Sequence, residues 1–354
     1  MPMGDRLKMA RVKAGLSLRA LAQSVEVSPM AISKYERGLV VPGSAMLVKM
    51  AKALEVKPDY FFRSTKIVLS PPSYRRSQSL PVKNQHMIMG EVQDWLERYM
   101  EVESLFLDKP PGFQMPEGFP RRISSIPEAE FVAERLRHAW DLGEDPIENL
   151  SEVLEEHYLR VVLVEGGEGF DALTLWADNK FPVIAIRRGL PGDRHRLNLA
   201  HELGHNLMEC DDSVDPEKAA FRFAGALLVP AKAAMWELVG RRRNINFIEL
   251  HSLKHKYGIS MQAWIYRAKD LNIITERVAA RHFREFRQRG WRTREPGDQL
   301  PPEEPRRMKR LVMQALAENQ ISRSRAGELL GEPLAKFWEE EAAKHGGFPE
   351  APYS

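Results

Sequence analysis

The 354 residues are too many for one ordinary hydrophobic core, and a content of 43% hydrophobic and 29% charged residues is that of a globular protein. No apolar run approaches the ~20 residues that a transmembrane helix needs, and the first residues, MPMGDRLKMARVKAG, lack the apolar core of a signal peptide. The single cysteine, Cys210, excludes an internal disulfide and a cysteine-rich zinc site. We therefore expect a cytoplasmic protein of two or three domains, with no membrane segment.

The net charge of +3 is unevenly distributed along the chain. Residues 1–66 hold twelve lysines and arginines against five acidic residues, a net charge of +7 that leaves −4 for the rest. A small basic domain on a mildly acidic body is the pattern expected when only the first part of the chain meets nucleic-acid phosphates.

The first part of the chain predicts a compact helical domain followed by a linker. Apolar positions recur every three or four residues between residues 4 and 62, and glycine and proline interrupt them, which predicts several short helices. Residues 66–87 contain prolines and serines with little periodicity. We expect them to form an extended linker.

The middle of the chain predicts helices and a small sheet. Helical patterns at 88–107 and 127–157 flank the Pro- and Gly-rich loop KPPGFQMPEGFP. Three runs rich in β-branched, leucine and aromatic residues follow, LRVVLVEG, FDALTLWAD and FPVIAIRRG, and they predict three strands. From residue 191 onward the pattern is again mainly helical, with a second Pro-rich break at 295–305.

Within the first domain, the segment GLSLRALAQSVEVSPMAISKYERG predicts two short helices that cross steeply, a helix-turn-helix. Ser17 and Ser28 stand at the N-cap positions of the two helices, and the turn lies around Glu26 and Val27. The alternative is a helical bundle that serves only for dimerisation or for binding another protein.

The segment resembles the XRE/Cro/lambda-repressor family, whose pattern LAxxxGVSxxxISxxExG it follows, and PGSAMLVKMAKALEVKPDYFF matches the closing helices of that family. The resemblance covers about the first 62 residues and implies a homodimer on a double-stranded DNA operator. Two departures from the family pattern predict a modest affinity for DNA. Glu26 replaces the usual turn glycine, which costs roughly 1 kcal/mol of stability if its backbone is left-handed, and Leu18 replaces a glutamine that frequently contacts a phosphate. The candidate DNA contacts are Pro29, Met30 and Lys34 at base edges, Ser17, Arg19, Ser28 and Arg37 near phosphates, and Ser33 on the same helix.

The sequence His201-Glu202-Leu203-Gly204-His205 has the spacing of a catalytic metal site. Two histidines four residues apart lie on one face of a helix, where they can share a tetrahedral zinc ion. Glu202, one residue after the first histidine, is placed to act as the general base.

A catalytic zinc ion needs a third protein ligand, and the best candidate is Glu217. Asp215 can cap a helix that begins at Pro216, which places Glu217 in its first turn; its alternative role is only to complement the helix dipole. Glu209 is a rival ligand, but on a continuous helix it would lie about 12 Å from His201. Cys210 is another nearby donor, which either caps the zinc in an inhibited state or is an ordinary core residue.

The same region resembles the ImmA/IrrE zinc metallopeptidases over residues 130–275. The resemblance is carried by FDALTLWAD, PVIAI, PGDRHRLNLAHELGHNLME, the pattern ExxAxxFAxxLLVP from Glu217 onward, and YGISMQAWIYRAKDLNII. It implies that His201, His205 and Glu217 bind one Zn²⁺ per chain and that Glu202 is the general base of peptide hydrolysis. In such enzymes a strand ahead of the active helix offers its free edge to the substrate, and we expect residues 183–187 (VIAIR) to be that strand.

Two segments near the C-terminus leave alternatives open. Residues 250–275 and 306–340 each predict a short helix, a turn and a second helix, which form either a further recognition element or a small unit that supports the peptidase domain or dimerises. The Arg-rich stretches GRRRN and RHFREFRQRGWRTR predict either nucleic-acid contacts or solvated helix faces.

These patterns predict an α+β, multidomain fold: an all-α helix-turn-helix domain (1–65), a linker (66–87), a zincin-like α+β metallopeptidase domain (88–275, with its core at 130–275) and a helical C-terminal region (276–354). The favoured function is a DNA-binding transcription regulator that hydrolyses a peptide bond in a regulatory protein, either an XRE-type repressor or the chain itself. The main alternative is an antitoxin or autorepressor of a toxin-antitoxin or phage-defence locus, whose peptidase-like domain binds a toxin or other partner without cutting it. A third is a peptidase whose N-terminal domain binds its repressor substrate and not DNA.

Overall fold

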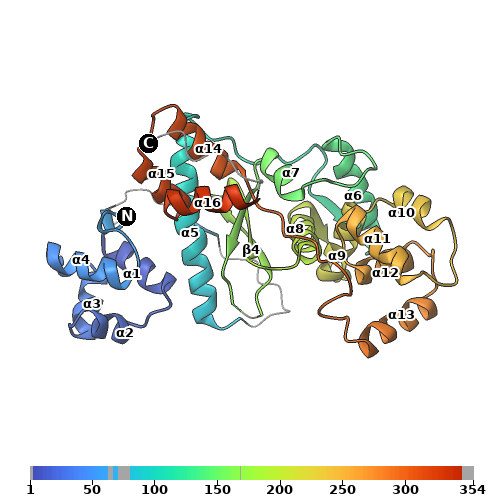
Figure 1. Ribbon diagram of the computed structural model, residues 1–354, viewed down its shortest axis with the longest axis horizontal. Helices are drawn as coiled ribbons and strands as arrows, with labels where there is room; N and C mark the ends of the chain where they lie inside the picture. The colour runs from blue at the N-terminus through green and yellow to red at the C-terminus, as the bar shows by residue number, and fades with distance from the viewer. Residues whose placement is uncertain (1–2, 63–66, 71–79, 168, 345–354) are drawn as a thin grey trace.

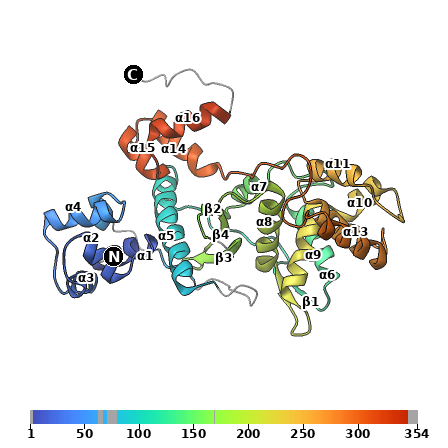
Figure 2. The same ribbon diagram turned by 60° about the horizontal axis from the view of Figure 1, so that its bottom comes forward.

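The computed structural model describes residues 3–62, 67–70, 80–167 and 169–344. The molecule is elongated, with the N-terminal helices at one end of its long axis and the helices of residues 231–288 at the other (Figure 1, Figure 2). None of the helices described is long and apolar enough to cross a membrane. The fold is α+β and multidomain, as predicted.

The N-terminal domain is a bundle of short helices around one small core. Leu7, Leu21, Ile32 and Met50 are buried at its centre. The elements are α1 (Met3–Lys13), α2 (Leu18–Ser24), α3 (Pro29–Glu36), α4 (Ser44–Ala53) and the 3-10 helix η1 (Pro58–Phe62).

The signals at the ends of α2 and α3 act as predicted. Ser17 Oγ accepts a hydrogen bond from the backbone N–H of Ala20 at 3.1 Å, and Ser28 Oγ accepts one from the N–H of Ala31 at 3.2 Å. Glu26, in the turn between the helices, has a φ of 60°, the left-handed backbone that favours glycine. The helix-turn-helix geometry therefore follows from local sequence signals.

The N-terminal domain docks on α5 (Val82–Ser104), which begins within the segment expected to be linker. Arg6 of α1 is fully buried and forms an ion pair with the buried Glu97 of α5. Gln93 extends this network, because its Nε2 donates to Glu97 Oε1 at 3.0 Å and to the carbonyl oxygen of Ile67 at 3.1 Å. The N-terminal domain, α5 and residues 67–70 are thus joined through buried polar contacts.

The three predicted strands form one sheet next to α5. They are β2 (Arg160–Val164), β3 (Ala172–Ala177) and β4 (Phe181–Arg187), in the order β2-β4-β3. β2 runs parallel to β4, and β3 runs antiparallel to it. Side chains alternate between the two faces: Val162 and Leu173 pack with α5, whereas Val161 and Ile184 pack with α8 (Gly192–Leu207).

Residues 183–187 do not form an edge strand, so this expectation is wrong. β4 pairs with β2 on one side and with β3 on the other, and the outer edge near α8 belongs to β3. The reason is the tight hairpin between β3 and β4, in which Asp178 and Asn179 have φ values of 50° and 53°. Two left-handed residues in succession are typical of the turn that pairs consecutive strands directly.

The helix that carries the HExxH sequence ends earlier than we expected. α8 ends at Leu207, and Met208–Cys210 form β5, which pairs in parallel with β1 (Arg121–Ile123). The expectation that Glu209 and Cys210 continue the helix is therefore wrong. β5 is specified by pairing with a segment that is distant in sequence, which no local pattern reveals.

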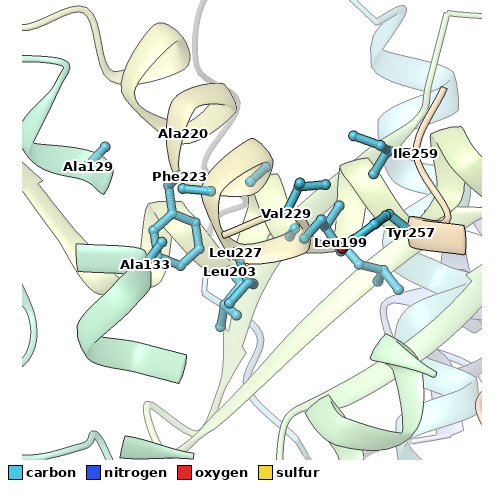
Figure 3. Packing of buried hydrophobic residues seen from close by; sticks show 14 of the residues in the cluster. Ala129, Ala133, Leu199, Leu203, Ala220, Phe223, Leu227, Val229, Tyr257 and Ile259 are labelled. Carbon is cyan, nitrogen blue, oxygen red and sulfur yellow. The ribbon is translucent and has the colours of Figure 1, made fainter. Parts of the chain in front are cut away.

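A large apolar core holds the rest of the domain together. In it, Leu199 and Leu203 of α8 pack with Phe223 and Leu227 of α9, and α6 covers α9 (Figure 3). The helices around this core are α6 (Glu128–Ala139), α7 (Leu150–Glu156), α9 (Pro216–Leu228), α10 (Ala231–Leu238), α11 (Phe247–Tyr257), α12 (Met261–Asp270) and α13 (Glu276–Gln288).

The helix pair predicted within 250–275 is α11 and α12. Trp264, Ile265 and Ala268 of α12 are fully buried in the large core. A helix that reads DNA must expose its face to the groove. The structure therefore supports the alternative in which this pair is a packing unit.

The last helices pack in a different place from α13. They are α14 (Arg307–Ala317), α15 (Arg323–Leu330) and α16 (Leu334–Lys344). Val312, Ala326 and Leu329 form a small core with Tyr99 and Val102 of α5. The segment 276–354 is thus divided between two cores, since α13 belongs to the large one.

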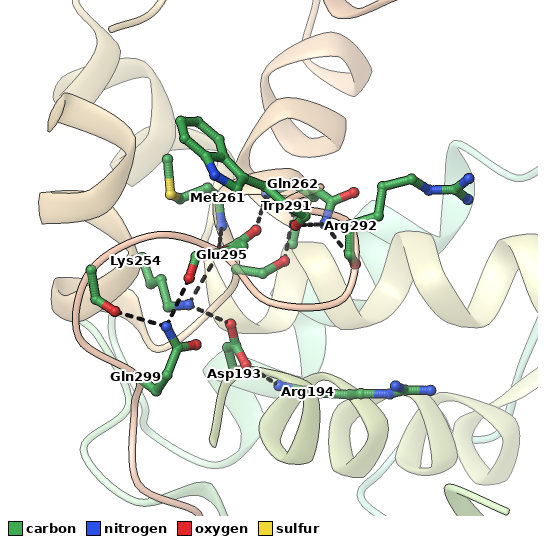
Figure 4. Close-up of polar contacts among 12 residues, drawn as sticks. Asp193, Arg194, Lys254, Met261, Gln262, Trp291, Arg292, Glu295 and Gln299 are labelled. Atoms are coloured by element: carbon green, nitrogen blue, oxygen red, sulfur yellow. Dashed lines mark hydrogen bonds and ion pairs between the residues drawn. The ribbon is translucent and has the colours of Figure 1, made fainter. Parts of the chain in front are cut away.

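The Pro-rich segment that joins α13 to α14 is fixed by a buried ionic network (Figure 4). Lys254 Nζ lies 2.9 Å from Asp193 Oδ2, at the start of α8, and 3.0 Å from Glu295 Oε2. Glu295 also accepts hydrogen bonds from the first backbone N–H groups of α12, Met261 at 2.9 Å and Gln262 at 3.0 Å. One carboxylate thus neutralises a buried cation and caps a helix.

We expect Glu295→Ala to destabilise the large core by about 3 kcal/mol, because it leaves a buried ammonium with one partner and two N–H groups with none. Urea unfolding followed by tryptophan fluorescence measures the loss. Lys232→Ala is the matched control: it breaks the exposed ion pair with Glu144, 3.4 Å, and should cost less than about 1 kcal/mol. Equal losses in the two variants would contradict the structural importance of the network.

Candidate functional site

Helices α8 and α9 bring three candidate metal donors together. His201 Nε2 and His205 Nε2, one turn apart on α8, lie 3.1 Å from each other. The Glu217 carboxylate, in the first turn of α9, lies 3.3 Å from His201 Nε2 and 3.4 Å from His205 Nε2. Within the described ranges, this is the one group of His, Cys, Asp or Glu residues with all donor atoms within 4.8 Å of each other, and Glu209 and Cys210 do not join it.

The spacing of the three donors fits a tetrahedral zinc ion. Zinc bonds to nitrogen and oxygen of about 2.0–2.2 Å place two tetrahedral ligand atoms about 3.3–3.5 Å apart. The three separations, 3.1, 3.3 and 3.4 Å, are close to that edge length. Two histidines and one glutamate leave a fourth position for water or substrate, which is the ligand set of catalytic zinc sites.

The position of Glu217 has local causes that the sequence shows. Asp215 Oδ1 accepts hydrogen bonds from the N–H groups of Glu217 at 3.1 Å and Lys218 at 3.3 Å, and Pro216 is the first helical residue, as predicted. Gly204 allows α9 to approach α8, since a Cβ at this position would lie 2.9 Å from Cδ1 of Phe223. The HExxH helix and the helix of its partner carboxylate are thus in direct contact.

His201 is held in the form that a metal requires. Burial, and to a smaller extent the neighbouring His205, lowers the pKa of His201 to about 3. The imidazole is therefore neutral at pH 7, with a nitrogen lone pair available. Among the described residues, its buried Nδ1 has no hydrogen-bond partner.

Glu202 lies beside the donors and contacts the edge of the sheet. Thr174 of β3 donates its Oγ1 hydrogen to Glu202 Oε2 at 2.8 Å. Burial is the main cause that raises the pKa of Glu202. The Thr174 hydroxyl opposes it, the nearby Glu217 carboxylate adds to it, and the resulting pKa is about 7. A carboxylate with a pKa near neutrality is suited to accept a proton and to return it.

The donors open into a cleft of about 800 Å³. Phe221, whose exposed fraction is 52%, lines it and packs against the His201 ring with a centroid distance of 4.3 Å. In the described part of the chain, no lysine or arginine lines the cleft, whereas six carboxylates do, so its field favours a bound cation. These carboxylates are Asp171, Glu202, Glu209, Asp211, Asp212 and Glu217.

The outer edge of β3 is partly occupied by the protein itself. Ser70 donates its N–H to the carbonyl of Trp176 at 2.8 Å, and its Oγ accepts the N–H of Trp176 at 2.9 Å. The carbonyl oxygen of Val68 accepts a hydrogen bond from the N–H of Asp178 at 2.8 Å. Between these two pairs of residues, Leu69 and Ala177 form an antiparallel bridge. Residues 67–70 therefore occupy the end of β3 that lies beyond Thr174.

The candidate DNA contacts lie at the exposed ends and faces of α2 and α3. Met30 has an exposed fraction of 66%, and Ser33 is half-buried. The Ser17 and Ser28 oxygens serve as helix caps, which leaves their hydroxyl hydrogens as donors. The contacts that are exposed are Ser17, Arg19, Ser28, Pro29, Met30, Lys34 and Arg37.

Sequence reasoning missed three parts of the cleft. Thr174 and Phe221 were visible only as members of a strand and of a helix, and residues 67–70 only as linker. Alternation along FDALTLWAD indicates which of its residues share a face, but not that Thr174 meets Glu202. These contacts depend on tertiary packing.

We expect Gly204→Ala to destabilise the domain and weaken metal binding. Alanine favours a helix by about 1 kcal/mol, but crowding against Phe223 costs about 1–3 kcal/mol and displaces α9, which carries Glu217. Thermal unfolding and zinc titration measure the two effects. Gly225→Ala on α9 is the control, since its Cβ would meet nothing closer than Arg267 Cδ at 3.7 Å. Unchanged stability and zinc affinity in Gly204→Ala would contradict the packing argument.

Comparison with known proteins identifies both halves of the chain. Residues 7–61 match the helix-turn-helix family, and residues 161–269 match the IrrE N-terminal-like domain family. The HTH-type transcriptional regulator y4wC of Sinorhizobium fredii is 30% identical over 93 residues, which are 26% of this chain and 61% of that protein. Repressor protein C2 of Salmonella phage P22 is 38% identical over 61 residues, 17% of this chain and 28% of that protein.

The chain therefore spans less than two thirds of the length of each of these relatives. The two family matches follow one another along the chain and agree with the two resemblances found in the sequence. This protein thus contains a region similar to helix-turn-helix domains, followed by a region similar to IrrE N-terminal-like domains.

Proposed function

We propose that this protein is a cytoplasmic, DNA-binding transcription regulator that hydrolyses a peptide bond in a regulatory protein. The observation that carries the enzymatic part is the triangle of His201, His205 and Glu217 donors, with the Glu202 carboxylate beside it. A purely structural helix has no need of two histidine donors, a third ligand and a partly buried base in one cleft.

In this proposal His201, His205 and Glu217 hold one zinc ion, which supplies a Lewis acid and lowers the pKa of water. Glu202 takes a proton from the attacking water and returns it to the leaving amine. Thr174 orients the Glu202 carboxylate through the hydrogen bond of 2.8 Å. The part of the β3 edge between Ala172 and Leu175 pairs with an extended substrate backbone.

The DNA-binding half rests on α2 and α3. Pro29, Met30 and Lys34 meet base edges in the major groove, while Ser17, Ser28, Arg19 and Arg37 lie nearer the phosphates. Ser33 is a further candidate contact on α3. Proteins of this type bind paired half-sites as dimers, so we propose a homodimer on a double-stranded operator. The names of the two relatives, a transcriptional regulator and a repressor, support this assignment.

The substrate we propose is an XRE-type repressor or this chain itself. The alternative is an antitoxin or autorepressor whose peptidase-like domain binds a toxin or other partner without cutting it. Residues 67–70 occupy one end of the β3 edge and limit the access of a substrate to it, which favours this alternative.

We expect Glu202→Gln to bind one zinc ion per chain, like wild type, and to lose cleavage, because the amide cannot accept the proton of water. Zinc is quantified by mass spectrometry. Cleavage is tested on the chain itself and on XRE-type repressors. Glu209→Gln, an exposed carboxylate of the same cleft outside the donor group, is the control that should retain both properties.

The outcomes separate the alternatives. If wild type and Glu202→Gln both bind zinc, and only wild type and Glu209→Gln cleave, the result supports the peptidase. Zinc in both proteins without cleavage by either supports a binding module, and wild type without zinc would overturn the metal site.

We expect Lys34→Ala to weaken binding to an operator, selected from random duplexes with wild type, by about 1–3 kcal/mol, roughly five- to 150-fold. Lys232→Ala is the control, since Lys232 is an exposed cation on α10, far from α3 (Figure 1). Fluorescence anisotropy measures both affinities at one salt concentration. An equal affinity in the two variants would contradict recognition by α3, and failure to select any operator would favour a protein-binding role for this domain.

A further inference from the structure

A second basic surface lies outside the helix-turn-helix domain. Residues 241–243 and 276–294 together hold ten arginines, no lysine and two glutamates. The other residues of 67–354 carry a net charge of −12, so this concentration of cations contrasts with the rest of the body.

The fold gathers these arginines on one side of α13. Ala279, His282 and Phe286 point into the large core. Arg277, Arg281 and Arg284, spaced by four and three residues, point to solvent on the opposite face. The arginine surface consists of eight exposed residues: Arg241, Arg243, Arg277, Arg281, Arg284, Arg287, Arg292 and Arg294.

None of these eight arginines forms an ion pair with a carboxylate within the ranges that the structure describes. The acidic residues nearest in the chain are engaged elsewhere: Glu285 lies 2.7 Å from Arg289, Glu276 3.6 Å from Lys269, and Glu249 2.9 Å from Arg242. Clustered like charges without counter-charges repel each other and raise the free energy of the folded protein. An anionic partner removes that repulsion.

The loop before α11 is positioned to extend this surface. Arg281 donates to the carbonyl oxygen of Arg243 at 3.1 Å and to Asn244 Oδ1 at 2.8 Å. These bonds tie the loop of residues 241–243 against α13. The cations therefore come from two segments that meet at Arg281, and not from a single helix stripe.

Arginine is the side chain that binds phosphate best, because its planar fork donates two parallel hydrogen bonds. Arg289, which is paired with Glu285, also stacks over Trp291 with 4.9 Å from its guanidinium carbon to the ring centroid. We propose that the arginine surface binds the phosphate backbone of duplex DNA without reading its sequence. This inference rests on the proposed function, because the anionic partner that the N-terminal helix-turn-helix domain brings close is then duplex DNA.

The location of the surface determines what such a contact does. α13 lies at the opposite end of the long axis from α2 and α3 (Figure 1, Figure 2). The arginine surface therefore contacts DNA outside the half-site that α3 reads, or a second duplex segment. Such a contact adds affinity that depends on salt and not on sequence.

The test uses the full-length protein with Lys34→Glu and Arg37→Glu, which disable the helix-turn-helix face. Into this background we introduce Arg277→Gln, Arg284→Gln and Arg287→Gln together, leaving Arg281 to hold the loop. The probe is a fluorescein-labelled random 30-bp duplex, titrated between 50 and 300 mM KCl. The matched control neutralises three exposed cations elsewhere, Arg135, Lys232 and Arg310.

We expect the triple arginine variant to bind at least tenfold more weakly at 100 mM KCl. A plot of log affinity against log salt should also be less steep, with a slope smaller in magnitude by about 2–3. The reason is that each phosphate contact contributes about 0.9 to the slope and the variant removes three arginines. The control should retain the affinity and the slope of the background, and equal unfolding temperatures exclude a folding defect.

Two results would overturn the proposal. One is an affinity and slope of the triple variant that equal those of the control. The other is unchanged DNA binding together with loss of binding to vesicles containing phosphatidylserine, which would assign the surface to an anionic membrane.

Discussion

The close packing of α8 against α9 is the constraint on which the candidate site depends. The two helices meet where Gly204 faces Phe223, and a single added methyl group at Gly204 would lie 2.9 Å from that ring. The same contact sets the distance from Glu217 to the two histidines, 3.3 and 3.4 Å. A helix that is easily recognised in sequence thus becomes a metal centre only through its neighbour.

Local sequence signals predicted much of this arrangement. The HExxH spacing places two donors on one helix face, and Asp215-Pro216 fixes the start of the helix that presents Glu217. The serine caps of α2 and α3 and the left-handed Glu26 likewise follow from short-range preferences. In each case the stabilising interaction joins residues at most four positions apart, so it is visible in the sequence.

Interactions between distant segments account for what could not be predicted. The pairing of β5 with β1 ends α8 early and removes Glu209 and Cys210 from the helix. Placing β4 in the centre of the sheet requires knowledge of both of its partners, β2 and β3. Arg6 is buried against Glu97, on a helix that begins about eighty residues later in the chain. The sequence alone therefore cannot distinguish Arg6 from the basic residues of the same domain that are candidate DNA contacts.

The pairing of residues 67–70 with the end of β3 limits the length of any peptide that the cleft can align. One strand edge offers each backbone group to a single partner, so an incoming chain that extends past Leu175 must displace Ser70 from Trp176. Residues 67–70 are also bonded to Gln93 and, through it, to the dock of the N-terminal domain. A longer peptide in the cleft therefore displaces part of the segment whose first residue, Ile67, is bonded to the helix that carries the N-terminal domain.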